Sequence, residues 1–286
     1  MNQKNRIRRQ KFLKMHGTGN DFVILDARTA SFSLDRKTIR ALTNRRTGIG
    51  CDQLLVIEAS KQADAFMRIY NADGSEAAQC GNGTRCVAFL IMNEVGKDEV
   101  VIETGSGLLK CHKVPGGIAI DMGEPIFDWR KIPLSEQRDT LHLGLNMGTL
   151  KDPAALSVGN PHIVFFVEDS GSINLETLGP KIENYFLFPE RINVSVAEVR
   201  SRNEIRLRVW ERGTGITLAC GTAACATLVA AAGRDLTGRK ATILMDGGNL
   251  AVEWRGDNRI VLSGAIETSF SGEMDIPAAS QEEHVA

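Results

Sequence analysis

Two stretches of this chain, RIYNADGSEAAQCGNGTRC (68–86) and RVWERGTGITLACGTAAC (208–225), decide its fold because they are two copies of one pattern. Each runs from an Arg through an apolar–aromatic pair to a polar residue, and a Cys-Gly follows that residue by nine positions (80 − 71 = 9; 220 − 211 = 9). Each copy then enters small and apolar residues, 84–95 or 222–232, that predict a helix. The chain therefore contains a repeated unit.

The two copies keep a single spacing at five positions. Asn20 and Asn160 are 140 residues apart (160 − 20 = 140). Four further pairs keep that offset: Gln53 with Asn193, Arg68 with Arg208, Asn71 with Glu211, and Cys80 with Cys220. The period is far longer than the roughly 20–50 residues of solenoid repeats. It indicates an ancestral duplication and hence two similar domains.

The flanking segments match in character as well. Gly-Asn precedes a strand-like run in GNDFVILD (19–26) and in GNPHIVFF (159–166). Downstream, 100–122 and 241–263 both have the pattern of three strands joined by glycine-containing turns. We expect residues 1–125 to form the first domain, completed by residues 270–278, and residues 126–269 to form the second.

Composition fits a two-domain globular chain. The 286 residues are 43% hydrophobic and 24% charged, enough to bury two cores. A net charge of −1 gives no nucleic-acid footprint, and no apolar run is long enough to span a membrane. The basic segment MNQKNRIRRQK (1–11) lacks the apolar stretch of a signal peptide, so we expect a solvated tail. The C-terminal PAASQEEHVA is expected to be equally loose.

Six cysteines without a secretion signal favour reduced thiols and a cytoplasmic location. The C-x5-C and C-x4-C spacings, with His162 as the nearby histidine, do not suit a zinc site, and no metal is expected. Most of the cysteines are expected to be buried and structural. They are Cys51, Cys86, Cys111 and Cys225.

Cys80 and Cys220 differ from these because each stands where a glycine-rich turn becomes a helix. The first N–H groups of a helix are unpaired and its dipole is positive there, which favours a thiolate and the binding of an anion. Two such halves facing each other would place two thiols on opposite sides of one cleft. That arrangement suits inversion of a stereocentre, which needs a base on one face of a carbon and an acid on the other.

The proton next to a carboxylate is only weakly acidic, so the carbanion-like transition state needs donors aimed at the carboxylate, which two helix starts can supply. A pyridoxal cofactor would require a Schiff-base lysine. The repeated segments contain no Lys from 62 to 96 or from 182 to 239, which argues against that route.

Six stretches carry a resemblance to a known family: HGTGNDFVILD (16–26), CDQLLVIE (51–58), RIYNADGSEAAQCGNGTRC (68–86), GNPH (159–162), RIN (191–193) and ERGTGITLACGTAACA (211–226). They resemble the diaminopimelate epimerases along nearly the whole chain. The resemblance implies a cofactor-independent two-base isomerase that interconverts LL- and meso-diaminopimelate for lysine and peptidoglycan precursor synthesis. It also implies an α+β fold of two pseudo-symmetric domains, each a β-barrel-like sheet around a central helix, and a homodimer.

The family's roles carry over residue by residue. Cys80 and Cys220 resemble the acid–base thiols, with Cys80 acting on the LL isomer and Cys220 on the meso form. The helix-start groups that hold the reacting carboxylate are Gly81, Asn82, Gly221 and Thr222. Further substrate contacts are Asn20, Gln53, Asn71, Asn160, Asn193, Glu211 and Arg212. His162 with Glu211 resembles a pair that tunes the thiols and the reacting amine.

The chain departs from the family pattern at Ile216, where a Glu is common, and at Ala223, where a second Gly is usual. Arg68 and Arg208 keep the repeat, but we expect them in structural ion pairs or on a solvated face. Three alternatives stay open: a racemase for proline or hydroxyproline, a thiol redox protein and a bare binding module. A racemase for a small cyclic amino acid needs fewer polar groups, because its substrate has no second amino acid head. A thiol redox protein predicts no exchange of substrate α-protons with solvent.

Overall fold

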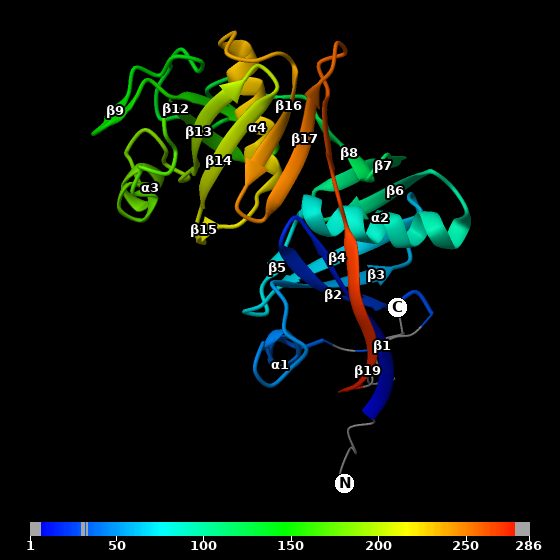
Figure 1. The fold of residues 1–286 in the computed structure, drawn as a ribbon. Helices are drawn as coiled ribbons and strands as arrows, with labels where there is room; N and C mark the ends of the chain where they lie inside the picture. Colours follow the sequence, from blue (N-terminus) through cyan, green and yellow to red (C-terminus); the bar gives the residue numbers. More distant parts are fainter. Residues whose placement is uncertain (1–6, 30–31, 33, 278–286) are drawn as a thin grey trace. The chain divides into compact units, whose positions relative to one another are not determined.

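A computed structural model describes residues 7–29, 32 and 34–277 (Figure 1). The chain divides into two compact units. The first unit comprises residues up to Ile118 and from Ala265 onward, and the second comprises Ala119–Gly264.

The first unit is built mainly of strands around one long helix. Its elements are β1 (Ile7–Gly17), β2 (Asn20–Asp26), α1 (Arg36–Thr43), β3 (Gln53–Glu58), β4 (Ala65–Asn71), β5 (Glu76–Ala77), α2 (Gly81–Val95), β6 (Glu99–Thr104), β7 (Gly107–Val114) and β19 (Glu267–Pro277). β8 (Gly117–Gly123) begins at the end of this unit and lies mostly in the second.

The second unit repeats this order. Its elements are β9 (Asn146–Met147), β10 (Leu150–Lys151), β11 (Ala154–Ser157), β12 (Pro161–Val167), α3 (Leu175–Glu183), β13 (Asn193–Ser201), β14 (Glu204–Glu211), β15 (Gly215–Thr217), α4 (Gly221–Gly233), β16 (Lys240–Met245), β17 (Gly248–Trp254) and β18 (Ile260–Gly264).

Strand pairing confirms the duplication. β2 pairs parallel with β3, and β12 pairs parallel with β13. β3–β4 and β13–β14 are antiparallel, whereas β4–β6 and β14–β16 are parallel. Each unit therefore has the same mixed sheet, and the predicted α+β fold with two related domains is confirmed. The helices predicted over 84–95 and 222–232 are also present, as α2 and α4.

The long helix of each unit is enclosed by strands of that unit. α4 is apolar on all sides, and Ala223–Ala231 are buried without interruption, as expected of a central helix. It packs on β11, β12, β14, β17 and other strands of the second unit, while α2 packs on β1, β2, β4, β6 and β7. α2 ends at Gly96, whose left-handed backbone (φ 68°) lets its N–H close the last turn on Met92 O.

The N-terminal expectation is wrong for residues 7–11. They belong to β1, which pairs antiparallel with β19 from Ile7↔Pro277 to His16↔Glu267 (Figure 1). This pairing supplies backbone partners that no local signal reveals, because the two strands are separated by nearly the whole chain. Residues 1–6 and 278–286, which include most of the C-terminal PAASQEEHVA, lie outside the described residues.

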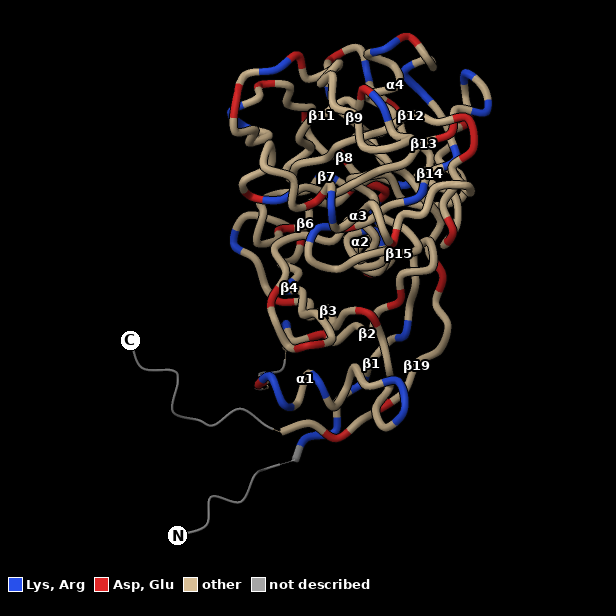
Figure 2. Tube along the Cα trace, turned by 90° about the vertical axis from the view of Figure 1, so that its left-hand side faces the viewer, with Lys and Arg blue, Asp and Glu red and all other residues tan. Residues whose placement is uncertain are grey.

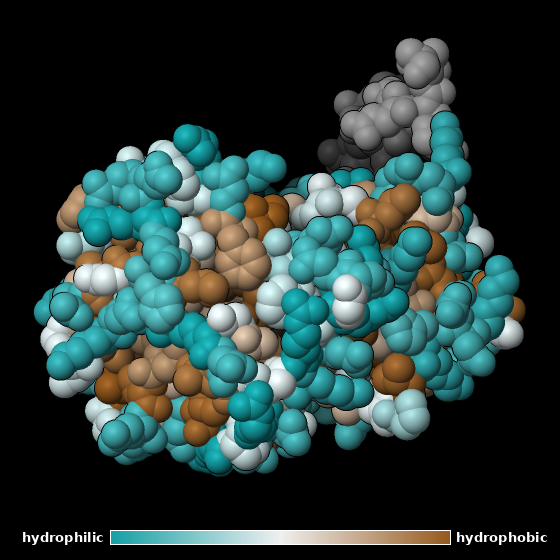
Figure 3. All heavy atoms as spheres, turned by 90° about the horizontal axis from the view of Figure 1, so that it is seen from above, coloured by the Kyte–Doolittle hydropathy of each residue, from teal (hydrophilic) through white to brown (hydrophobic). Residues whose placement is uncertain are grey.

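Charged residues are distributed over both units, with Lys and Arg interspersed among Asp and Glu (Figure 2). On the face drawn in Figure 3, apolar atoms lie in small groups among polar ones. Among the helices that the structure describes, none combines the length and the apolar character needed to cross a membrane.

Candidate active site

The residues of the 140-residue repeat occupy matching places in the two units. They lie at or just before the start of β2 and β12, at the first residue of β3 and β13, at the last residue of β4 and β14, and directly before α2 and α4. The pairs are Asn20 with Asn160, Gln53 with Asn193, Asn71 with Glu211, and Cys80 with Cys220. The duplication therefore places one set of polar groups and one thiol in each unit.

Cys80 is the N-cap residue of α2, with an extended backbone (φ −150°, ψ 103°). Its half-buried Sγ accepts a hydrogen bond from the N–H of Gly83 at 3.3 Å, which satisfies one of the unpaired donors at the helix start. A Cβ on Gly83 would lie 2.9 Å from Leu55 Cδ1, so a side chain there would disturb this turn. Glycine thus keeps the helix start against the sheet.

Asn20 and Asn82 lie beside Cys80. Asn20 starts β2 after a two-residue turn, Thr18-Gly19, in which both residues have positive φ. Its Oδ1 lies 3.8 Å from Cys80 Sγ and 3.4 Å from Asn82 Nδ2. The structure therefore brings three of the predicted residues of the first unit together.

Gln53 and Asn71 form a second polar pair in the first unit. They face each other across the β3–β4 ladder, and Gln53 Nε2 donates to Asn71 Oδ1 at 3.0 Å. Asn71 Nδ2 in turn donates to Ser75 Oγ at 3.0 Å. These contacts hold both amides at the ends of their strands.

Cys220 is the N-cap residue of α4 and is only 7% exposed. Its Sγ lies 3.4 Å from Thr222 Oγ1. Burial raises the pKa of the Cys220 thiol well above its usual range, and the nearby Glu211 carboxyl adds to that shift. Desolvation therefore opposes the stabilisation of a thiolate that is expected of the helix start at Cys220.

Glu211 ends β14 next to this thiol. Thr217 Oγ1 donates to Glu211 Oε1 at 2.5 Å. Burial raises the pKa of Glu211 above its ordinary value, against the hydrogen bonds that it receives from Thr217 and Cys220. Glu211 and Cys220 therefore form a buried pair within which a proton can be shared.

His162, Asn160 and Thr222 form a chain of contacts that ends beside Cys220. His162 Nε2 lies 2.9 Å from Asn160 Oδ1, and Asn160 Nδ2 lies 3.3 Å from Thr222 Oγ1. His162 is fully buried on β12, and burial together with the charge of Arg212 lowers its pKa to about 3. The imidazole is therefore neutral at physiological pH.

This neutral histidine predicts a dependence of stability on pH. Because its folded pKa lies below the unfolded value of about 6.5, its contribution is complete above pH 6.5 and is lost as pH falls toward 3. Between pH 7 and pH 5 the unfolding free energy of the wild type should fall because of His162, and in His162→Gln this fall should be smaller by about 2 kcal/mol. Urea titrations at both pH values measure this difference. His112→Gln, on β7, is the control, and equal pH dependence in both variants would refute the assignment.

Asn193 and Arg212 are joined through the backbone. The N–H of Arg212 donates to Asn193 Oδ1 at 2.9 Å, and Asn193 Nδ2 donates to Pro161 O at 2.8 Å. Arg212 Nη1 donates to Glu190 O at 3.0 Å. Asn193 therefore fixes the turn after β14 on which Arg212 and Glu211 are carried.

Sequence reasoning missed Glu183, a buried carboxylate at the end of α3. It accepts hydrogen bonds from Gly213 N at 2.9 Å and from Trp210 Nε1 at 2.7 Å, and so supports the same turn. The repeat contains a signal for it, because the offset relates Glu183 to Thr43 (183 − 140 = 43). Thr43 Oγ1 donates to Ala72 O at 3.2 Å at the corresponding turn of the first unit.

The structure also shows the contacts of the two repeated arginines and the burial of the cysteines expected to be structural. Arg68 forms ion pairs with Glu58 and Glu76, as expected. Arg208 instead donates to the carbonyl oxygens of Ser170 and Ile173. The four cysteines expected to be structural are all buried, and none of them forms a disulfide: Cys51, Cys86, Cys111 and Cys225.

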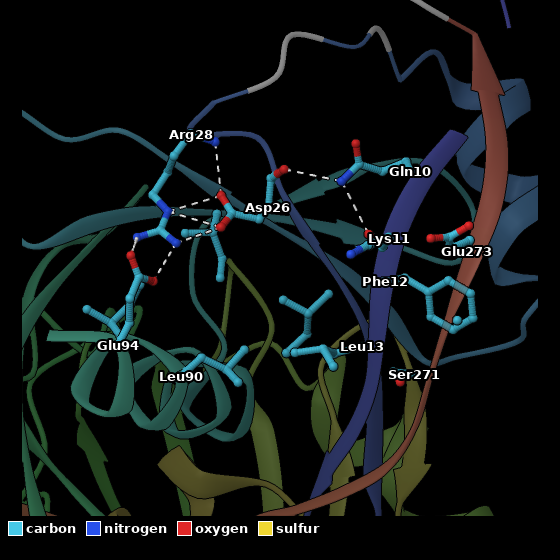
Figure 4. Close-up of a pocket in the computed structure, with 14 residues that line it drawn as sticks. Gln10, Lys11, Phe12, Leu13, Asp26, Arg28, Leu90, Glu94, Ser271 and Glu273 are labelled. Carbon is cyan, nitrogen blue, oxygen red and sulfur yellow. Dashed lines mark hydrogen bonds and ion pairs between the residues drawn. The ribbon is translucent and has the colours of Figure 1, made fainter. Parts of the chain in front are cut away.

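A cavity of about 540 Å³ lies in the first unit between β1, β19 and the last turns of α2 (Figure 4). Leu90 and Glu94 line it from the helix, at the end opposite to Cys80. Arg28 closes one side through ion pairs with Asp26 and Glu94. The cavity contains none of the predicted site residues.

Comparisons with known proteins agree with the sequence resemblance. Residues 12–127 and 154–268 match the family model described as diaminopimelate epimerase. Diaminopimelate epimerase from Rhodospirillum centenum is 50% identical over 93% of this chain and 92% of its own length. The protein of that name from Acidiphilium cryptum is 50% identical over 92% of this chain and 96% of its own.

Solved structures with the same fold are more distant. A Bacillus anthracis phenazine biosynthesis protein of the PhzF family superposes with a TM-score of 0.65 at 17% identity, over 93% of this chain and 99% of its own. A hydroxyproline epimerase from Agrobacterium vitis, with bound trans-4-hydroxy-L-proline, gives a TM-score of 0.61 at 14% identity. The match covers 96% of this chain and 93% of the epimerase. At these identities the likeness concerns the fold.

Proposed function

The chain belongs to the diaminopimelate epimerase family, and we propose that it interconverts LL- and meso-diaminopimelate through Cys80 and Cys220. The observation that carries this proposal is the repeat itself, which puts a cysteine at the N-cap of the central helix in both units. The product serves lysine and peptidoglycan precursor synthesis, the general role of this family.

The reaction moves one proton on each side of the α-carbon. In the LL-to-meso direction the Cys80 thiolate removes the α-proton and becomes a thiol, while the Cys220 thiol delivers its proton to the opposite face and becomes a thiolate. The raised pKa of Cys220 supports this direction, because it keeps the donor protonated before the substrate reacts. The meso isomer reacts with the roles exchanged.

The negative charge that develops on the substrate needs hydrogen-bond donors. The first N–H groups of α2 and α4 are suited to hold the reacting carboxylate, since helix starts bind anions. Gly81 and Asn82 would supply them in the first unit, and Gly221 and Thr222 in the second. The carboxylate is then stabilised by backbone dipoles and the chain's own residues supply every proton.

The non-reacting end of the substrate carries an amine and a carboxylate. We assign its recognition and that of the reacting amine to Arg212 and to the amides at the strand ends. These amides are Asn20, Gln53, Asn71, Asn160 and Asn193. Such a polar set suits a long dibasic, diacidic substrate better than a small cyclic amino acid. His162 is neutral, and we propose that it orients Asn160 while Glu211 adjusts Cys220.

Incubating the purified protein with separate substrates tests this assignment. LL-diaminopimelate should be converted to the meso isomer, followed by chiral chromatography, whereas L-proline and trans-4-hydroxy-L-proline should remain unchanged. Conversion of either cyclic amino acid with diaminopimelate left intact would favour the racemase alternative instead.

We further propose that the chain works as a homodimer in the cytoplasm. None of the six cysteines, all of which lie in the described part of the chain, forms a disulfide, and reduced thiols fit a reducing compartment. Light scattering after gel filtration should give twice the mass of one chain. A monomeric mass with full epimerase activity would reject the dimer.

A further inference from the structure

Asp52, in the turn before β3, holds the side chain of Asn20. Asn20 Nδ2 donates to Asp52 Oδ2 at 2.9 Å, and the N–H of Asp21 donates to the same oxygen at 3.1 Å. A carboxylate accepts hydrogen bonds and has none to donate, so the Asn20 amide must present its NH2 group to Asp52. Its oxygen therefore faces the other way, toward Cys80 Sγ at 3.8 Å and Asn82 Nδ2 at 3.4 Å.

Asp52 is itself held from several sides. Its backbone N–H donates to Asp21 O and Asp21 Oδ1, both at 3.0 Å. Arg45 Nη2 bridges the two carboxylates, at 2.7 Å from Asp52 Oδ1 and 2.6 Å from Asp21 Oδ1. The buried Lys14 ammonium pairs with Asp21 and with Gly50 O. Both oxygens of Asp52 thus have hydrogen-bond partners, which favour the orientation that faces Asn20.

This network stabilises the charged form of Asp21. Burial alone would raise the pKa of Asp21, but hydrogen bonds from Arg45 and Lys14 hold it well below its usual range. Asp21 is therefore ionised at neutral pH and pairs with Arg45, which also contacts Asp52. Through Arg45, this ion pair supports the position of the Asp52 carboxylate.

The second unit has no equivalent of Asp52. The offset places the buried Ile192 at that position (52 + 140 = 192). In the second unit the oxygen of the Asn160 amide contacts His162. Its NH2 group donates to Thr222, which lies beside Cys220. The two asparagines of the repeat therefore turn opposite ends of their amides toward the two helix starts.

We propose that Asp52 is a positioning residue for Cys80, which fixes the Asn20 amide so that an acceptor, and never an NH2 donor, faces the thiol. This rests on the proposed function for its catalytic meaning. A donor in that place would stabilise the thiolate and make it a weaker base toward the α-proton. An acceptor leaves the thiolate basic, and it accepts a hydrogen bond from the S–H group once Cys80 has taken the proton from the substrate.

The variant Asp52→Asn tests the proposal. The amide has one oxygen where the carboxylate has two, so Asn20 Nδ2, Asp21 N–H and Arg45 Nη2 compete for a single acceptor, and the Asn20 amide is no longer held with its oxygen toward Cys80. We expect the pH of half-maximal Cys80 alkylation by iodoacetamide to fall by about one unit, the equivalent of one hydrogen bond to a charged group. We also expect kcat to fall about tenfold while KM changes less than about threefold.

Alkylation is read by mass spectrometry after trypsin, because peptide 69–85 carries Cys80 as its single cysteine. Asp98→Asn is the matched control, since the Asp98 side chain is 83% exposed and its nearest cation, Lys113, is 3.9 Å away. Cys220 is an internal control whose profile should not move; its peptide, 213–234, also carries Cys225, so fragment ions assign the label to one of the two cysteines.

An unchanged Cys80 profile in Asp52→Asn would overturn the proposal, and so would a variant that only melts at a lower temperature. The alkylation profile needs no substrate and no turnover. A failure of the proposed function would appear elsewhere, as an active Cys80→Ala enzyme, so the two failures are distinguishable.

Discussion

Cys80→Ala and Cys220→Ala are each expected to lose at least about 10³-fold in kcat/KM for epimerisation, in both directions. Each change removes the proton donor or acceptor from one face of the α-carbon, and alanine offers no replacement. The assay follows the formation of meso-diaminopimelate from the LL isomer and the reverse reaction.

The fold should survive these changes. Each cysteine lies at the start of its helix, and its replacement by alanine removes only the thiol group. Circular dichroism and a thermal melt of each variant check this point. Cys111→Ala, at a buried cysteine on β7, should keep wild-type turnover. A Cys80→Ala or Cys220→Ala enzyme with near-normal activity would remove that residue from the mechanism.

Arg212→Ala is expected to raise KM for LL-diaminopimelate about 100-fold, with a smaller effect on kcat. Removing one partner of a hydrogen-bonded charge pair costs about 2–5 kcal/mol. The guanidinium is held by Glu190 O and the residue's own N–H by Asn193 Oδ1, so its direction is fixed before substrate binds. Initial rates over a range of substrate concentrations measure the effect.

Two further variants sharpen this prediction. Arg212→Lys keeps the charge but loses the planar fork, so its KM should lie between those of the wild type and Arg212→Ala. Arg202→Ala is the control, because Arg202 is exposed and its contact with Asp235 is 3.8 Å long. An unchanged KM in Arg212→Ala would show that another group recognises the substrate carboxylate.

The repeat predicted much of what the structure contains. Four of the five residue pairs at one offset lie at strand ends or helix starts, because a duplicated fold keeps its side chains at equivalent backbone positions. The helices over 84–95 and 222–232 followed from the same pattern. Local sequence was therefore sufficient to predict the central helix of each unit and the position of its cysteine at the start of that helix.

Features that depend on distant contacts were not predictable in this way. Pairing of β1 with β19 joins the two ends of the chain, so residues 7–11 gave no local strand signal. The raised pKa of Cys220 follows from burial beside Glu211, which no spacing reveals. Asp52 was missed because its role departs from the repeat, where Ile192 takes its place.

The most direct test of two-base catalysis is proton exchange during a single conversion in D2O. At early times, newly formed meso-diaminopimelate should carry one deuterium at the inverted α-carbon, whereas the remaining LL isomer should still carry hydrogen. Chiral separation followed by mass spectrometry gives both values. A meso product that retains the original hydrogen would show that a single base removes and returns the proton, and would contradict the paired roles of Cys80 and Cys220.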